Sequence, residues 1–191
     1  MNKIQNLVTR TVKKNLLWIC VMGIYLFGFT NSCIVSASME PTLMTHDIAL
    51  FINTYGLITP NRGDIVSFQM GNEYWTKRVI GLPGDTIEFI EDIVYVNGTE
   101  LDEEYLPDDT VTRAYMQTVY YVPEDCIFVL GDNRSCSNDS RFWATPYVPI
   151  NKVMCKHLCT LGNISFFFPN KPAPIEEIGM PDIVEYPNTE E

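Results

Sequence analysis

The fold of this chain is decided by a short apolar run that ends in a turn, Glu73-Tyr74-Trp75-Thr76-Lys77-Arg78-Val79-Ile80-Gly81-Leu82-Pro83-Gly84-Asp85. β-Branched and aromatic residues fill the run, and glycine and proline close it, as in a β-strand followed by a turn. Similar runs occur at 48–52, 64–68, 86–90, 93–96, 115–122, 126–130 and 152–168. Asn97-Gly98 adds a two-residue hairpin turn. We therefore expect an all-β domain, built as a folded-over sheet or an irregular barrel.

The N-terminal part differs from this β-rich remainder. Residues 15–39 carry no charge, and the apolar section within them approaches the ~20 residues that a helix needs to cross a bilayer. Four basic residues precede it, while acidic residues begin only at Glu40. This asymmetry predicts a transmembrane helix at 15–33 with a cytoplasmic N-terminus. Two alternatives remain: a cleaved signal peptide that is cut near Ala37, and a lipoprotein signal that ends at Cys33.

The expected organisation therefore has four parts. They are a basic cytoplasmic N-terminus at 1–14, the anchor at 15–33, an extracytoplasmic β domain at 34–168 and an acidic, proline-rich tail at 169–191. The chain has a net charge of −11, and four of its 13 basic residues stand before position 15. The external part is thus strongly acidic and a poor partner for nucleic acid. We predict a monomeric, single-pass protein of the cell membrane.

The six cysteines indicate neither a metal site nor a definite set of disulfides. None forms a C-x-x-C pair, and only His46 and His157 could add nitrogen ligands, so a zinc site is weakly supported. Disulfides are possible outside the cytoplasm, and free thiols are equally compatible with the sequence. Nothing local favours either histidine as a catalytic base. We expect no metal and no cofactor.

Lys77 is the only lysine between residues 15 and 151. Strand alternation places it on one face with Trp75 and Val79. An amine that such neighbours desolvate loses proton affinity, and a neutral lysine can act as general base for a serine. The alternative is a lysine at a strand edge whose charged end stays in water.

Two further segments carry polar residues in unusual density. The first is Ser36-Ala37-Ser38-Met39-Glu40-Pro41-Thr42-Leu43, and the second is Gly131-Asp132-Asn133-Arg134-Ser135-Cys136-Ser137-Asn138-Asp139-Ser140-Arg141. In the second, Asp139 and Arg141 could form a charge-assisted brace while a serine orients the lysine. Each segment, taken alone, is also compatible with an ordinary solvated turn.

Together, the segments resemble a known family. Ser-x-Ser-Met-x-Pro-Thr-Leu, Arg-Gly-Asp-Ile-Val-Ser-Phe, Lys-Arg-Val-Ile-Gly-Leu-Pro-Gly-Asp and Gly-Asp-Asn-Arg-x-x-Ser-x-Asp-Ser-Arg occur in this order within residues 36–141. The chain looks like a type I (leader) signal peptidase. The resemblance implies a membrane-anchored serine protease on an all-β fold, which removes signal peptides from exported preproteins at the outer face of the membrane.

The resemblance also implies a role for each matching residue. Ser38 would be the nucleophile and Lys77 the general base of a Ser/Lys dyad. Supporting roles would fall to Ser36 in the oxyanion hole, to Ser137 as a partner of the Lys77 amine, and to Asp139 and Arg141 as a brace. Partners would be signal peptides and the lipid bilayer.

An extended substrate peptide would add as a β-strand between the segment before Ser38 and the strand of Lys77. Shallow pockets would then select small residues at the first and third positions before the cut. The candidate lining residues, each also acceptable as core, are Ile34, Val35, Met39, Leu43, Trp75 and Thr76. The chain departs from the family pattern at Ala37, where glycine is common, and at Trp75, which is bulky; Cys136 has no assigned role.

Two other functions remain as alternatives. A self-cleaving peptidase of the repressor type would use the same Ser/Lys chemistry, but it would carry a DNA-binding domain where this chain has an apolar segment. An inactive membrane-anchored protein could bind exported peptides without cutting them; the presence of every proposed catalytic residue argues against it.

Overall fold

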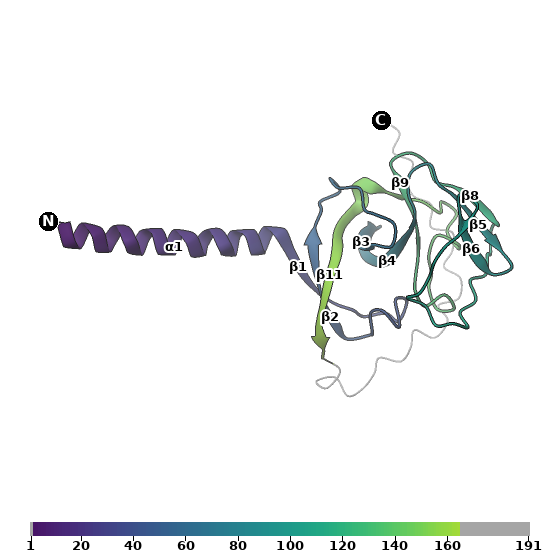
Figure 1. Ribbon diagram of the computed structural model, residues 1–191, viewed down its shortest axis with the longest axis horizontal. Coiled ribbons are helices and arrows are strands. Elements are labelled where there is room, and N and C mark those ends of the chain that lie inside the picture. Colours follow the sequence, from purple (N-terminus) through teal and green to yellow (C-terminus); the bar gives the residue numbers. More distant parts are fainter. Residues whose placement is uncertain (1, 165–191) are drawn as a thin grey trace.

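The computed structural model describes residues 2–164, as one long helix and a β domain (Figure 1). Helix α1 (Asn2–Gly28) projects away from the domain. The strands are β1 (Phe29–Cys33), β2 (Asp47–Asn53), β3 (Ile65–Met70), β4 (Glu73–Gly81), β5 (Thr86–Ile90), β6 (Ile93–Val96), β7 (Thr99–Glu100), β8 (Val119–Tyr121), β9 (Cys126–Leu130), β10 (Val148–Pro149) and β11 (Val153–Asn163). A single 3-10 turn, Ile150–Lys152, precedes β11. The predicted all-β domain is thus confirmed.

The strands form two sheets. Seven of them lie in the order β1-β2-β11-β3-β4-β9-β10, and four in the order β7-β6-β5-β8. The larger sheet curls over itself, and the smaller one lies on the side of the domain farthest from α1 (Figure 1). Within residues 2–164, β1 and β10 are the edges of the larger sheet, so the folded-over sheet is the correct description and a closed barrel is not.

Strand β9 lies between two hydrophobic cores. Ile127 and Val129 pack into a core with β3, β4 and β11, while Phe128 and Leu130 pack into a second core with the smaller sheet. All four side chains are fully buried, which explains the unbroken apolar run in the sequence. The strand therefore holds the two sheets together, and it delivers the polar residues after Leu130 to a fixed place.

The N-terminal segment differs from the prediction at its end. The helix stops at Gly28, and residues 29–33, which were included in the predicted anchor, form strand β1 against β2. Polar residues at 30–32 and the free edge of β2 favour a strand there over a last turn of helix. Among the described residues, no helix combines the length and the hydropathy that crossing a bilayer requires.

Most predicted strands are confirmed, with changes at their ends. The predicted strand at 115–122 is reduced to β8, and the short strands β7 and β10 were not predicted. The Asn97-Gly98 turn joins β6 to β7, with a positive φ at both residues. The predicted tail at 169–191, and the last residues of the predicted strand at 152–168, lie outside the described residues.

Candidate active site

The Ser36–Leu43 segment is held down by two apolar side chains. Met39 and Leu43 are buried in a third core, with Phe51 and Ile65 among its members. The Leu43 N–H also donates a 2.9 Å hydrogen bond to the Met39 carbonyl, which closes one turn of chain. Burial on one side of this turn fixes the backbone of Ser38, whose side chain points toward β4.

Lys77 meets Ser38 from the middle of β4. Its Nζ donates a 2.8 Å hydrogen bond to Ser38 Oγ and a 3.2 Å bond to the Thr76 carbonyl. Both side chains are buried, with 4% of Lys77 and 8% of Ser38 exposed. Burial lowers the pKa of Lys77 from 10.5 to about 8, although Asp139 and Asp132 act to raise it. The site therefore holds a lysine that is readily made neutral beside a serine hydroxyl.

Ser36 adds a second hydroxyl to this pair. Its Oγ lies 3.2 Å from Ser38 Oγ, at hydrogen-bonding distance, and either atom can donate. The sequence placed the two serines on one short segment, and the structure brings their side chains together. A hydroxyl at this position can donate to an oxygen that develops negative charge next to Ser38.

Residues 131–141 form the wall behind Ser38. The Asn133 N–H donates a 3.1 Å hydrogen bond to the Ser38 carbonyl, and Asn133 Nδ2 donates a bond of the same length to the Ala37 carbonyl. The backbone of the serine segment is thus bound to the wall by both the backbone and the side chain of Asn133. Asn133 was not among the predicted site residues, although it stands in the quoted motif.

Gly131 lets this wall approach Ser38 closely. A Cβ atom on Gly131 would lie 2.1 Å from Ser137 Oγ and 2.5 Å from the Ser38 carbonyl oxygen, which no side chain tolerates. The φ angle of Gly131 is not in the left-handed region, so this glycine is required for space and not for backbone conformation.

The brace predicted between Asp139 and Arg141 is present. Arg141 Nε donates to Asp139 Oδ1 at 2.8 Å, and Arg141 Nη2 donates to Asp139 Oδ2 at 2.9 Å. Neither residue is exposed to solvent. Asp139 also accepts a 3.0 Å hydrogen bond from the Gly131 N–H. The carboxylate therefore fixes both ends of the 131–141 wall.

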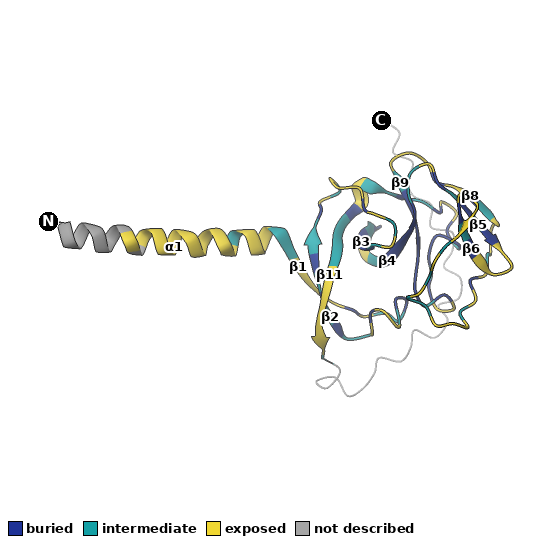
Figure 2. Cartoon of the chain, in the orientation of Figure 1, coloured by how far each residue is buried: buried dark blue, intermediate teal, exposed yellow. Residues whose placement is uncertain are grey.

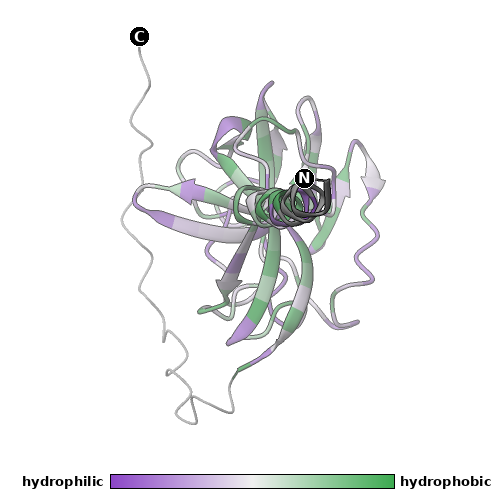
Figure 3. Ribbon diagram, turned by 90° about the vertical axis from the view of Figure 1, so that its left-hand side faces the viewer, coloured by the Kyte–Doolittle hydropathy of each residue, from purple (hydrophilic) through white to green (hydrophobic). Residues whose placement is uncertain are grey.

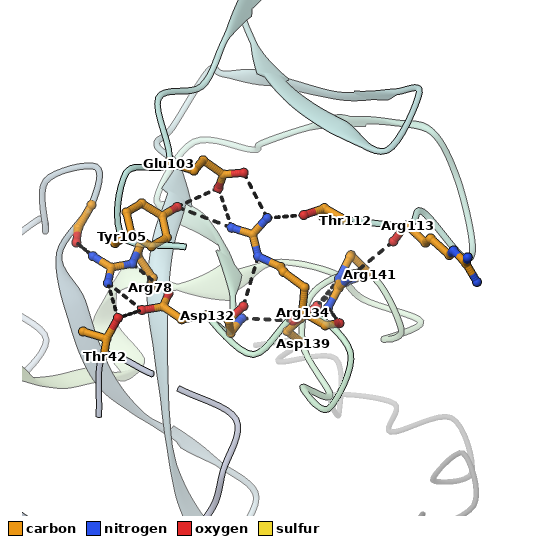
Figure 4. A network of polar contacts seen from close by, with 12 residues as sticks. Thr42, Arg78, Glu103, Tyr105, Thr112, Arg113, Asp132, Arg134, Asp139 and Arg141 are labelled. Atoms are coloured by element: carbon orange, nitrogen blue, oxygen red, sulfur yellow. Dashed lines mark hydrogen bonds and ion pairs between the residues drawn. The ribbon is translucent and has the colours of Figure 1, made fainter. Parts of the chain in front are cut away.

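A second buried pair was not predicted. Arg78 follows Lys77 on β4 and donates to both carboxylate oxygens of Asp132, at 2.8 and 2.6 Å (Figure 4). Thr42 also donates to Asp132. The pair connects the strand of the lysine to the wall and to the serine segment. Both residues stand in the motifs, but sequence alone does not indicate that they pair.

Ser137 is buried in the 131–141 wall, but it does not make the predicted hydrogen bond with the Lys77 amine. The Lys77 amine bonds to Ser38 and Thr76 instead, and Ser137 Oγ has no hydrogen-bond partner among the described residues. Its hydroxyl lies close to Gly131, at 2.1 Å from the position that a Cβ atom on this glycine would take. Cys136, its neighbour, is exposed.

The six candidate pocket residues are divided between core and surface. Ile34, Met39 and Leu43 are buried in the third core, so their side chains support the site from below. Trp75 and Thr76 are partly buried, and Val35 is 74% exposed. The Trp75 ring lies 5.6 Å from Lys77 Nζ and packs edge-on against Trp143. Of the six candidates, only Val35, Trp75 and Thr76 thus keep part of their surface accessible to solvent.

The geometry suits acyl transfer. A buried amine with a lowered pKa contacts a serine hydroxyl, and the oxygen of a second hydroxyl lies 3.2 Å from the first. Among residues 2–164, no group of three or more His, Cys, Asp or Glu side chains is arranged to hold a metal ion. All six cysteines, which lie within these residues, are free thiols.

Comparisons with known proteins point to one family of peptidases. The sequence model of the family described as "Signal peptidase, peptidase S26" matches residues 8–161. A probable signal peptidase I-2 of Synechocystis sp. is 39% identical over 145 residues, which cover 71% of this chain and 64% of the relative. A signal peptidase I of Bacillus caldolyticus is 39% identical over 155 residues, which cover 72% of this chain and 82% of the relative.

A solved structure of a signal peptidase I from Enterococcus faecalis is 33% identical, with a TM-score of 0.41, and covers 50% of this chain and 94% of that one. The family match includes the serine segment, the lysine strand and the 131–141 wall, whose residues meet in one site. By this match over most of its length, the chain belongs to the signal peptidase family, peptidase S26.

Proposed function

We propose that this chain is a serine endopeptidase that cleaves signal peptides from exported preproteins, with Ser38 as nucleophile and Lys77 as general base. One observation carries the proposal: a buried lysine with a pKa of about 8 lies within 2.8 Å of a serine hydroxyl. The same chemistry in a self-cleaving peptidase is the second candidate, but the similarity to signal peptidases of Synechocystis and Bacillus caldolyticus favours the first.

The reaction follows from these contacts. Neutral Lys77 takes the proton of Ser38 as Oγ bonds to the scissile carbonyl carbon, and the resulting ammonium gives that proton to the departing amine as the C–N bond breaks. A water molecule then repeats the sequence on the acyl-enzyme, so that the acid product leaves and Ser38 regains its proton. No other group needs to gain or lose a proton.

The oxyanion of each tetrahedral intermediate needs donors at the position where charge develops. The Ser36 hydroxyl, 3.2 Å from Ser38 Oγ, and the Ser38 N–H are the proposed donors. Ser137, Asp139 and Arg141 are proposed to support the wall behind the dyad. Preorganised donors of this kind act without reorganisation during the reaction.

The substrate is proposed to bind as an extended strand beside residues 34–36 and β4. Val35 and Thr76 would lie along it, and the Trp75 indole would limit the size of the accepted side chains. Ile34, Met39 and Leu43 would shape the pockets from beneath. Small residues at the first and third positions before the cut fit this shallow surface.

Membrane anchorage through the N-terminal segment is a further part of the proposal. In the described part of α1, large apolar side chains are exposed along the helix, among them Ile24 at 68% and Phe27 at 74% (Figure 2). Apolar residues also dominate the end-on view of α1 (Figure 3). Basic residues precede this section and an acidic domain follows it, which favours a cytoplasmic N-terminus at 1–14 and an extracytoplasmic catalytic domain at 34–168.

Cleavage of a synthetic signal peptide by the full chain in detergent tests the activity. We expect cleavage by the wild type and its loss in Ser38→Ala and Lys77→Ala. Ser32→Ala, at an exposed serine outside the site, and Lys156→Ala are controls that should remain active. Equal cleavage by the dyad variants would refute the assignment, and binding without cleavage by the wild type would favour the inactive binding protein.

Flotation of the full chain with lipid vesicles tests the anchor. We expect the full chain to float with the vesicles and a chain that lacks residues 1–28 to remain at the bottom of the gradient. Flotation of both would place the membrane contact on the β domain, and flotation of neither would remove the bilayer from the proposal.

A further inference from the structure

The loop between β7 and β8, residues 101–118, crosses from the smaller sheet to the 131–141 wall. Its path is fixed at several points: the Leu101 N–H bonds to the Val94 carbonyl at 2.9 Å, and the Thr112 N–H bonds to the Asp92 carbonyl at 3.1 Å. Between these points, its polar side chains face the arginines of the wall (Figure 4). None of the four sequence motifs includes a residue of this loop.

Glu103 of this loop holds Arg134 of the wall. Both carboxylate oxygens of Glu103 accept hydrogen bonds from the Arg134 guanidinium, and Thr112 Oγ1 accepts another. Only 1% of the Arg134 side chain and 16% of the Glu103 side chain are exposed. A buried guanidinium that loses such a partner is left as an uncompensated charge, so the contact strongly restricts where Arg134 can lie.

Arg134 also holds the backbone of the wall that lies behind Ser38. Its Nε donates a 3.1 Å hydrogen bond to the Gly131 carbonyl. Two residues after Gly131, the Asn133 N–H holds the Ser38 carbonyl at 3.1 Å. The short segment from Gly131 to Arg134 is therefore held by the loop on one side and holds the serine backbone on the other.

Tyr105 acts on the strand of the lysine. Its ring lies 3.8 Å from the centre of the Arg78 guanidinium, and its hydroxyl donates a 2.6 Å hydrogen bond to Glu103. Arg78 is the neighbour of Lys77 and is paired with Asp132. Burial raises the pKa of Tyr105 well above its ordinary value, and nearby Glu103 adds to the effect, so the phenol stays protonated and keeps donating.

We propose that Glu103 and Tyr105 are positioning residues for the Ser38–Lys77 pair, Glu103 acting through Arg134 and Tyr105 through Arg78. The inference rests on the proposed peptidase function and extends it to a loop outside the family motifs. Neither side chain has a contact with the dyad, so both influence it only by fixing the two arginines. Their joint effect is to set the distance between the serine segment and the lysine strand.

Kinetics of Glu103→Gln test the first half of the proposal. Small displacements of reacting groups cost up to about 10²-fold in rate. We therefore expect kcat to fall by about 10- to 100-fold, with KM within about threefold of wild type, because substrate-contacting residues are unchanged. Glu104→Gln, an exposed neighbour, is the matched control and should behave as wild type. An unchanged kcat, or a change confined to KM, would overturn the role of Glu103.

Two substitutions at Tyr105 separate the ring from the hydroxyl. Tyr105→Phe keeps the ring over Arg78 and should retain most of the activity, whereas Tyr105→Leu removes the ring and should lose about tenfold or more in kcat. Tyr121→Leu, at a side chain that is 71% exposed, is the control. Equal activity of the Leu and Phe variants would overturn the role of the ring.

Coupling to Arg134 distinguishes positioning from general destabilisation. If Glu103 acts through Arg134, the double variant Glu103→Gln/Arg134→Gln should be no slower than Arg134→Gln alone. Val94→Ala, a change in the core of the smaller sheet, is the control for lost stability, and it should keep wild-type kcat at temperatures below its own melting temperature. Additive losses, or an equal loss in Val94→Ala, would overturn the proposal.

A readout independent of catalysis is the titration of Lys77, followed by NMR of labelled lysine. Because burial is the main cause of the lowered pKa of Lys77, loosening by Glu103→Gln should move the midpoint upward from about 8, with Asp132, Asp139 and Arg141 still in place. An unmoved midpoint would count against the proposal even if the wild type cut no peptide. Cleavage by the wild type but not by Ser38→Ala judges the peptidase function separately.

Discussion

Lys77 Nζ lies 2.8 Å from Ser38 Oγ, although 39 residues separate the two in the sequence. The lysine comes from the middle of a strand and the serine from a turn that two buried side chains hold in place. The negative charges of Asp139 and Asp132 raise the pKa of Lys77, but the effect of burial, which lowers it, is larger. Burial is therefore what makes Lys77 able to act as a base, and its pKa should depend on how far water is excluded from the site.

The pH dependence of cleavage is the most direct consequence. Only neutral Lys77 can take the Ser38 proton, so kcat/KM should rise with pH around a midpoint near 8 and level off above it. A lysine with its ordinary pKa of 10.5 would give a rise at a pH about 2.5 units higher. Measuring kcat/KM of the full chain from pH 6 to pH 11, in detergent, distinguishes the two profiles.

Replacing the base should stabilise the fold while abolishing activity. The folded pKa of Lys77 lies below the unfolded one, so burying the amine costs stability; this cost is fully present below pH 8 and disappears above about pH 10.5. We expect Lys77→Met to raise the free energy of unfolding by about 1–3 kcal/mol at pH 7, at ~1.4 kcal/mol per pKa unit. Denaturant unfolding at pH 7 and pH 11 checks the size and its decline; a loss of stability at pH 7 would contradict the burial argument.

Ser36→Ala should slow the reaction without disturbing the dyad. Removal of one oxyanion donor typically costs about 10²–10³ in kcat, and we expect a loss of this size with little change in KM. Ser36→Thr keeps the hydroxyl and should recover part of the rate. If kcat fell by less than about fivefold, the Ser36 hydroxyl would not stabilise the oxyanion in the transition state.

Gly131→Ala tests the close approach of the wall. The added methyl would fall 2.1 Å from Ser137 Oγ and 2.5 Å from the Ser38 carbonyl oxygen, so the wall or the serine segment must move. We expect a loss of about 10²-fold or more in kcat and of about 1–3 kcal/mol in stability. Gly23→Ala, where nothing lies within 4 Å of the added methyl, is the matched control. Full activity of Gly131→Ala would show that the wall is free to move.

Trp75→Ala should broaden the choice of substrate. The indole stands beside Lys77 and packs against Trp143 at a ring distance of 5.9 Å. Its removal leaves space next to the substrate strand, so peptides with a larger residue at the third position before the cut should gain about tenfold relative to alanine-containing peptides. Tyr74→Ala, on the opposite face of β4 and 66% exposed, should leave this ratio unchanged. Equal ratios in both variants would remove Trp75 from the pocket.

Local patterns were sufficient to predict most of the strands. Alternation in β4 placed Lys77 beside Trp75, and the apolar run before Gly131 predicted the strand that is β9. Residues 29–33 were assigned to the helix because they are uncharged; their pairing with β2 depends on a strand far along the chain, which a local reading does not include. The Ser/Lys site was predicted because both residues stand in long motifs.

Apart from the Ser38–Lys77 pair, the side-chain contacts between distant segments could not be predicted. Arg78 and Asp132 lie 54 residues apart, and their pairing depends on how β4 and β9 align. Glu103 and Tyr105 lie in a loop with no motif or periodic pattern, so nothing in the sequence connects them to Arg134 or Arg78. Such contacts depend on how the two sheets pack together, which only the three-dimensional fold specifies.

The end of α1 is tied to the β domain rather than loosely linked. The Phe27 carbonyl accepts hydrogen bonds from Asn53 Nδ2, at 2.9 Å, and from the Tyr55 hydroxyl. Only residues 29–37 separate the helix from Ser38, and fully extended they span about 30 Å. If the proposed function holds, a signal peptide that lies alongside α1 would reach Ser38 only where the segment before its cut fits this limited distance, so the enzyme would select the length of that segment as well as its side chains.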